Sequence, residues 1–200
     1  AQVGLYAVAV AVAETIWHVP MSVHLNLFPR VAALGAEEGA RRLPRALRMT
    51  FLLSAALALA LLFLGKMLIG VLFGSSFLPA YAALAVLLPG VLAISVSNVF
   101  ESFFAGIDRR HYQSIAVGCA FVLSLGLGLW LIPVYGALGA GIASTASYIL
   151  QMAISIALFS RLGQIKWREF LVPRPADLSD LYRLLKELFR PGDRQRARSL

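Results

Sequence analysis

Residues 124–148 read SLGLGLWLIPVYGALGAGIASTASY and contain no charged side chain. One apolar segment runs up to Ile132 and Pro133, and a second apolar segment follows Gly136. Pro lacks the N–H group that continues a helix, and Gly tolerates left-handed backbone dihedrals. The stretch therefore predicts two apolar helices that are joined by a tight turn.

The second helix of this hairpin carries small residues at intervals of four, namely Gly139, Ala143 and Ser147. A stripe of small residues lets another helix approach closely, which is how helices associate in lipid. We therefore expect these three residues to mediate helix packing within a membrane bundle.

The composition of the whole chain agrees with a membrane location. Of its 200 residues, 60% are hydrophobic and 14% are charged, and the mean hydropathy is +0.79, values far from those of a soluble domain.

The chain has few residues suited to metal binding or disulfides. Its three His residues and its one Cys, Cys119 within an apolar run, supply neither a disulfide framework nor a metal site. Catalytic motifs such as G-x-S-x-G or H-E-x-x-H are absent from the sequence, so we expect no enzymatic activity, metal or cofactor.

Five segments are long enough to cross a bilayer, whose apolar core of about 30 Å needs about 20 residues of helix. The predicted spans are residues 3–27, 50–73, 79–104, 114–132 and 137–159. The expected fold class is therefore all-α, with a polytopic bundle of five transmembrane helices in residues 1–160 and a basic tail in residues 161–200.

The basic residues are distributed as this assignment requires. All but one of the 18 Lys and Arg residues lie in residues 30–48, in residues 107–113 or in the tail, and the exception is Lys66. The connections at 74–78 and 133–136 contain none, so basic and uncharged connections alternate. The positive-inside rule then predicts an outer N-terminus and a cytoplasmic C-terminus for this chain. Lys66, near the outer end of its span, is expected to extend its ammonium group toward the headgroups.

The tail contains a segment, residues 178–190, with apolar side chains at helical spacing beside Arg183, Lys186 and Arg190. A basic amphipathic helix of this kind is typical of segments that lie on an anionic lipid surface. We expect membrane lipids, and not nucleic acid, as the partner of this tail despite the net charge of +8.

Four stretches resemble, in their sequence and in their order along the chain, the C-terminal part of polysaccharide-biosynthesis flippases of the multidrug/oligosaccharidyl-lipid/polysaccharide exporter superfamily. They are VGLYAVAVAVAETIWHVPMSVHLNLFPRVA, VLFGSSFLPAYAALAVLLPGVL, FFAGIDRRHYQ and LIPVYGALGAGIASTASY. The resemblance implies two six-helix lobes around a central cavity, with this chain as the second lobe lacking its first helix. The chain would then be the later part of a longer protein, and the missing N-terminal lobe would be its partner.

The implied function is export of an undecaprenyl-diphosphate-linked oligosaccharide across the bacterial cytoplasmic membrane by alternating access, a step in the biosynthesis of cell-envelope polysaccharide or lipopolysaccharide. One alternative is a cation-coupled multidrug antiporter of the same superfamily. Another is a non-transporting membrane scaffold or the membrane part of a glycosyltransferase.

Ionisable residues at membrane depth are functional candidates, because a charge in hydrocarbon costs several kcal/mol unless it is paired or hydrated. Glu14 and His18 are four residues apart in the first span and share a helix face. They would line a substrate or ion cavity and contact sugar hydroxyls or a proton, or they would form a neutral pair inside the bundle. The resemblance supports the first reading, because family members often carry an acidic residue at this place.

Two further sets of residues are candidates. Asn98 and Glu101 lie one turn apart in the third span, either at the cavity mouth or paired with a basic residue of the following loop. Pro20 and Pro89 fall inside spans, where each removes a backbone hydrogen bond and so provides a hinge for switching or an ordinary membrane-helix kink.

Overall fold

The computed structural model describes residues 2–162, apart from the side chains at 19, 20, 22–32, 34–36, 38 and 42. Every regular element in this part of the chain is a helix. The elements are α1 (Gln2–Ala13), the 3₁₀ turn η1 (Glu14–Trp17), α2 (His18–Leu72), the 3₁₀ turn η2 (Ser75–Phe77), α3 (Ala80–Gly106), α4 (Arg110–Tyr135) and α5 (Ala137–Arg161). Residues 163–200, which include the predicted amphipathic helix 178–190, lie outside the described residues.

Four helical segments are long and apolar enough to cross a membrane. They are Gly39–Leu72 within α2, Ala80–Gly106, Arg110–Tyr135 and Ala137–Arg161. The shortest has 25 residues and is about 38 Å long, against a bilayer core of about 30 Å. The prediction of an all-α bundle of apolar helices is confirmed, whereas the Gln2–Trp17 segment is apolar but shorter than a span.

The first span differs most from expectation. A continuous helix was expected over residues 3–27, but α1 ends at Ala13 and a 3₁₀ turn separates it from α2. The break has a local cause, because Pro20 has no N–H to bond the carbonyl of Ile16, which lies in that turn.

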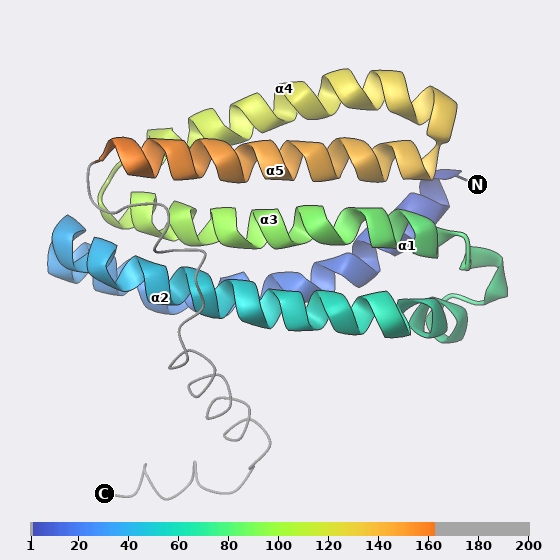
Figure 1. The fold of residues 1–200 in the computed structure, drawn as a ribbon, viewed down its shortest axis with the longest axis horizontal. Coiled ribbons are helices and arrows are strands. Elements are labelled where there is room, and N and C mark those ends of the chain that lie inside the picture. Colours follow the sequence, from blue (N-terminus) through green and yellow to red (C-terminus); the bar gives the residue numbers. More distant parts are fainter. Residues whose placement is uncertain (1, 163–200) are drawn as a thin grey trace, which may run out of the picture.

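α2 then continues through residues 30–48, where a connection was expected. A straight 55-residue helix would be about 82 Å long, but Figure 1 shows α2 as two arms that run in opposite directions. The second arm therefore reaches its span length by including the basic stretch that precedes residue 50.

The helices form a layered bundle in the order α4, α5, α3 and α2, with α1 beside α3 and α2 (Figure 1). α3 is the most buried of the long helices, whereas less than a third of the apolar window is buried in each of α2, α4 and α5. α3 and α5 are therefore the two central helices of the bundle, and α4 forms one of its edges.

Two apolar clusters make up the core. The first joins α1, η1, the end of α2 and the beginning of α3, with Ile16, Ile69 and Leu84 fully buried. The second joins Leu43 and Leu47 of α2 to the end of α3 and to Phe159 of α5. Its centre is aromatic, with the Phe159 ring centroid 5.2 Å from that of Phe103 and 5.5 Å from that of Phe100.

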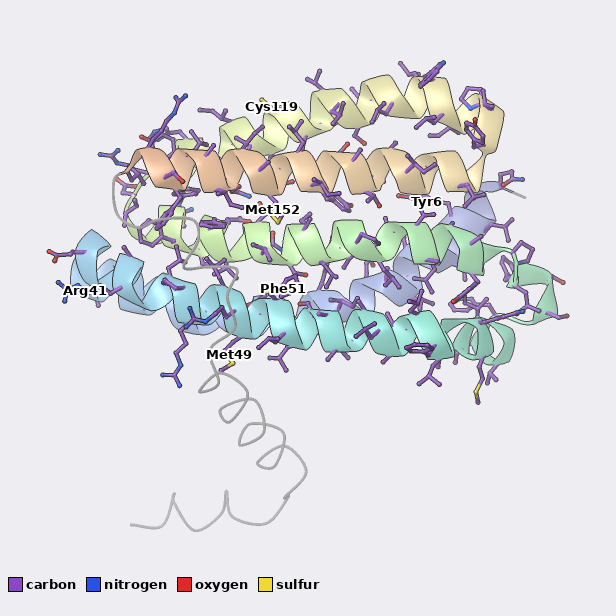
Figure 2. The ribbon with its side chains drawn as sticks, in the orientation of Figure 1. Tyr6, Arg41, Met49, Phe51, Cys119 and Met152 are labelled. Carbon is purple, nitrogen blue, oxygen red and sulfur yellow. The ribbon has the colours of Figure 1, made fainter. Side chains whose placement is uncertain are left out.

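The two ends of the bundle have different charge. At one end the Gln2 side-chain oxygen accepts a hydrogen bond from the Ala137 N–H at 3.2 Å, and Gly4 lies beside Phe77. This end therefore gathers the beginning of α1, the η2 connection and the α4–α5 turn, none of which contains Lys or Arg. The opposite end contains Arg41 and the α3–α4 turn. Figure 2 shows Arg41 at the end of the bundle away from Tyr6.

The α4–α5 turn is tighter than the sequence suggests. Pro133 was expected to follow the helix, but α4 continues through it to Tyr135, and the turn is made by Gly136 at φ 57°. Pro in the last turn of a helix removes one hydrogen bond, and the left-handed Gly136 then ends the helix, with its N–H bonded to the Ile132 carbonyl at 2.8 Å. The second helix begins at Ala137 directly after it.

The small residues of α5 lie in helix contacts, as Gly139, Ala143 and Ser147 are all buried. A Cβ at Gly139 would collide with the backbone carbonyl of Leu131 on α4. Gly139 thus permits the close packing of the α4–α5 hairpin, and it does not open the helix as a turn residue.

Gly90 makes a very close contact between α3 and α5. A Cβ built at Gly90 would lie 2.7 Å from the Thr145 Cα and 2.9 Å from its Oγ1. The Thr145 hydroxyl also donates a 2.7 Å hydrogen bond to the Val86 carbonyl. Only glycine allows this backbone approach, so Gly90 sets the distance between the two central helices.

The first prediction concerns this contact. Gly90→Ala should lower the free energy of unfolding by about 1–3 kcal/mol, because its methyl group would push α3 and α5 apart. Gly118→Ala is the matched control, since a Cβ there meets nothing within 4 Å and Ala favours the helix. Thermal unfolding of the two variants in the same detergent measures the difference, and equal unfolding temperatures would contradict the packing described here.

Candidate functional site

Glu14 and His18 lie on the outside of the bundle, where the 3₁₀ turn η1 joins α1 to α2. Both side chains are exposed, whereas Ile16 between them is fully buried. Tyr6 and Val10 precede them at the same four-residue interval, so the four residues follow one side of the chain. The Thr15 hydroxyl donates to the Val12 carbonyl at 2.8 Å, which satisfies a backbone group at the break.

α5 completes this face. The Tyr6 hydroxyl and the Ser144 hydroxyl are hydrogen-bonded at 2.7 Å, although 138 residues separate them in sequence. One turn further along α5, Tyr148 is half-buried and lies within electrostatic range of both Tyr6 and Glu14. We call the surface formed by Tyr6, Glu14, Ser144 and Tyr148, together with the exposed His18 four residues after Glu14, the α1–α5 face.

The α1–α5 face combines neutral hydrogen-bonding groups with a single carboxylate. Glu14 is the one Asp, Glu, Lys or Arg residue between positions 2 and 29, and positions 137–160 contain none. Phenol, hydroxyl, imidazole and carboxylate groups can donate to and accept from sugar hydroxyls, and the carboxylate can take up a proton. The face contains no Lys or Arg that would pair with phosphate.

The second predicted pair lies elsewhere. Asn98 is half-buried and Glu101 is exposed on α3, beside Val99 and Phe100 of the second core cluster. Glu14 and His18 instead flank Ile16, which belongs to the first cluster. The four residues that were predicted to line one cavity therefore lie at two levels of the bundle.

The two predicted hinge residues differ in their surroundings. Pro89 lies inside α3, which continues as a helix on both sides of it, and its ring is exposed. Gly90, beside it, is locked against Thr145, so this part of α3 is tightly packed. Pro20 lies in the backbone of α2 three residues after η1, and its side chain is outside the described residues.

Residues 2–162 contain no group of three or more His, Cys, Asp and Glu residues placed to hold a metal ion. Comparison of the chain with family models, curated proteins and solved structures gives no match. The resemblance to flippases therefore rests on the sequence stretches quoted above.

Sequence reasoning missed three members of the α1–α5 face, namely Tyr6, Ser144 and Tyr148. The four-residue spacing from Tyr6 to Glu14 and His18 is visible in the sequence and could have included Tyr6. No sequence signal shows that Ser144 and Tyr148 face α1, because that depends on how α5 packs.

The second prediction tests the contact that closes this face. Tyr6→Phe and Ser144→Ala should each lower the free energy of unfolding by about 0.5–1.5 kcal/mol, because each removes one hydroxyl of a part-buried hydrogen bond. The double variant should cost clearly less than the sum of the two single losses. Ser160→Ala, whose hydroxyl bonds only its own helix at the Ile156 carbonyl, is the control and should add independently to Tyr6→Phe.

Proposed function

We propose that this chain is the C-terminal part of a lipid-linked oligosaccharide flippase, and that its α1–α5 face lines the cavity that holds the sugars. The observation that carries the proposal is the exposed Glu14 carboxylate beside the Tyr6, Ser144 and Tyr148 hydroxyls, whereas the exposed faces of α2 and α4 are mostly apolar. The motif resemblance supplies the substrate class, an undecaprenyl-diphosphate-linked glycan in the bacterial cytoplasmic membrane.

The outer faces of α2 and α4 suit contact with lipid. Phe63 on α2 and Leu129 on α4 are each 79% exposed, and they belong to long runs of exposed apolar residues on the two helices. Side chains project outward from α4 on one edge of the bundle and from α2 on the other (Figure 2). Soluble proteins rarely expose contiguous apolar surfaces of this extent, so these faces favour a bilayer as the surrounding solvent.

The α1–α5 face does not suit contact with lipid. A carboxylate at the centre of a bilayer costs about 2.5–3.5 kcal/mol or more, so an exposed Glu14 favours a surface that meets water or another part of the protein. A hydrated cavity between this lobe and a second lobe satisfies that requirement. Rocking of the two lobes about such a cavity would switch its access from one side of the membrane to the other.

We infer the orientation of the bundle from its charged end. We place the end that carries Arg41, Arg109 and Arg161 at the cytoplasmic surface, and the beginning of α1 and the Gly136 turn at the outer surface. The diphosphate of the substrate would bind Lys or Arg side chains at this cytoplasmic rim or on the missing N-terminal lobe, because the α1–α5 face contains no Lys or Arg. The basic tail would lie on the cytoplasmic leaflet.

The third prediction tests the role of Glu14 in transport. In a strain that lacks its own flippase, full-length protein should restore glycan export, and Glu14→Gln should lower export by about 10-fold or more. This size corresponds to the loss of one charge-assisted hydrogen bond to the substrate. Export is measured as surface glycan per cell at equal protein level in the membrane.

Glu37→Gln is the matched control for this experiment. Glu37 is an exposed carboxylate at the charged end that pairs with Arg41 at 2.9 Å, so its loss should leave export unchanged. No export with the unmodified full-length protein would contradict the flippase function itself. Normal export with Glu14→Gln would contradict the role of the α1–α5 face.

A cation-coupled antiporter is the second candidate, and the same lone carboxylate favours it. Without a neighbouring Lys or Arg on α1 or α5, Glu14 is suited to exchange a proton or sodium ion for a substrate. This function requires that substrate addition releases protons from the purified protein and that Glu14→Gln abolishes the release. Transport that is independent of pH and sodium would exclude it.

A further inference from the structure

Buried polar side chains separate the two apolar clusters of the core. On α3, Ser95 and Ser97 lie between Val91 of the first cluster and Val99 of the second. On α2, Thr50 and Ser54 lie between Leu47 and Ala58, and on α5, Gln151 and Ser155 lie between Tyr148 and Ile156. We call these six residues, together with the buried Gln113 of α4, the polar belt.

Hydrogen bonds within the polar belt connect three helices. The Ser97 hydroxyl of α3 lies 3.1 Å from the Ser155 hydroxyl of α5. The Ser155 hydroxyl is 2.9 Å from the Gln151 carbonyl oxygen and 3.5 Å from the Gln113 side-chain oxygen of α4. A hydroxyl has one proton, so Ser155 cannot donate to both oxygens at once, and the shorter bond to Gln151 is favoured.

The Gln113 amide is therefore poorly satisfied by protein groups. Gln113 is 7% exposed, and its buried Nε2 has no hydrogen-bond partner among the described residues. Rotation of the amide by 180° would bring Nε2 toward Ser155 and leave Oε1 in the unpartnered position, so one polar atom is orphaned in either case. Buried amide groups are rarely left in this state, and ordered water that makes two to four hydrogen bonds is the usual partner.

We propose that the polar belt binds an ordered water molecule where α3, α4 and α5 meet, and that the Gln113 side-chain amide holds it. Phe104 of α3 and Tyr112 of α4 lie beside this junction, with ring centroids 5.6 Å apart, so the water is close to the charged end of the bundle. The site is separate from the α1–α5 face and does not depend on the transported substrate. It tethers α4, which otherwise packs mainly on α5.

Replacement of Gln113 by Met tests the proposal, because Met keeps the length of the side chain and removes both polar atoms. If water satisfies the amide, Gln113→Met lowers the unfolding temperature of this 200-residue chain by about 2–4 °C, the shift expected for one lost hydrogen bond at that size. An unchanged or raised unfolding temperature overturns the proposal, because removal of an unsatisfied buried donor does not destabilise.

A Ser155→Ala background separates the water from the direct contact between Ser155 and Gln113. The bound water still holds Nε2 in this background, so Gln113→Met lowers the unfolding temperature there as well. If Gln113→Met no longer lowers the unfolding temperature in the Ser155→Ala background, the proposal is overturned. The stability that Gln113 provides would then come only from its direct contact with Ser155. Ser114→Ala is the control, since this exposed residue lies in the same turn of α4 and should leave the unfolding temperature unchanged.

If Gln113→Met fails to fold, nuclear magnetic resonance of the wild-type protein tests whether water is bound at Gln113. Cross-relaxation between the ¹⁵N-labelled Gln113 side-chain amide and a long-lived water is the expected result. A folded protein whose Gln113 amide shows no such cross-relaxation overturns the proposal.

Discussion

The separation of charge from the sides of the bundle is the constraint on which the rest of the structure depends. The described Arg residues lie in the first part of the second arm of α2, around the α3–α4 turn and at the end of α5, so they gather toward one end of the bundle. The proposed membrane location would account for this arrangement, because Arg on a helix face that meets hydrocarbon is costly. The apolar exposed faces of α2 and α4 and the uncharged Gly136 turn are consequences of the same constraint. Glu14, Lys66 and Glu101 are exposed charged residues within helices, and Glu14 is the one that lies with the Tyr6, Ser144 and Tyr148 hydroxyls, so the proposed function centres on it.

Packing between the two central helices connects this architecture to the α1–α5 face. Gly90 and Thr145 bring α3 and α5 into backbone contact, which fixes the rotation of α5 about its axis. With that rotation fixed, Ser144, beside Thr145 in sequence, meets Tyr6 of α1. α1, which ends at the break at η1, packs mainly on α3 and also contacts α5. A change at the α3–α5 contact would therefore move Ser144 relative to Tyr6 and so alter the candidate site.

Much of this fold could be predicted from the sequence, because each feature depends on local pattern. Apolar runs of sufficient length indicated the four long helices, and the alternation of Arg-rich and uncharged connections indicated how the ends are distributed. The sequence did not indicate that α4 continues through Pro133 or that α2 continues through residues 30–48, since a single Pro or a polar stretch is compatible with either helix or turn. Tyr6, Ser144 and Tyr148 were missed for a different reason, as their proximity is a property of helix packing and not of any one segment.

Cysteine labelling of the connections is the most direct test of the account, with Cys119 first replaced by Ala. Single cysteines at Ser76 and Tyr135 lie at the uncharged end, and those at Glu37 and Asp108 lie at the charged end. A membrane-impermeant maleimide should label positions 76 and 135 in intact cells, and positions 37 and 108 only after the membrane is permeabilised. Labelling of positions 76 and 108 from the same side would contradict a bundle that crosses the bilayer with its arginines on one side.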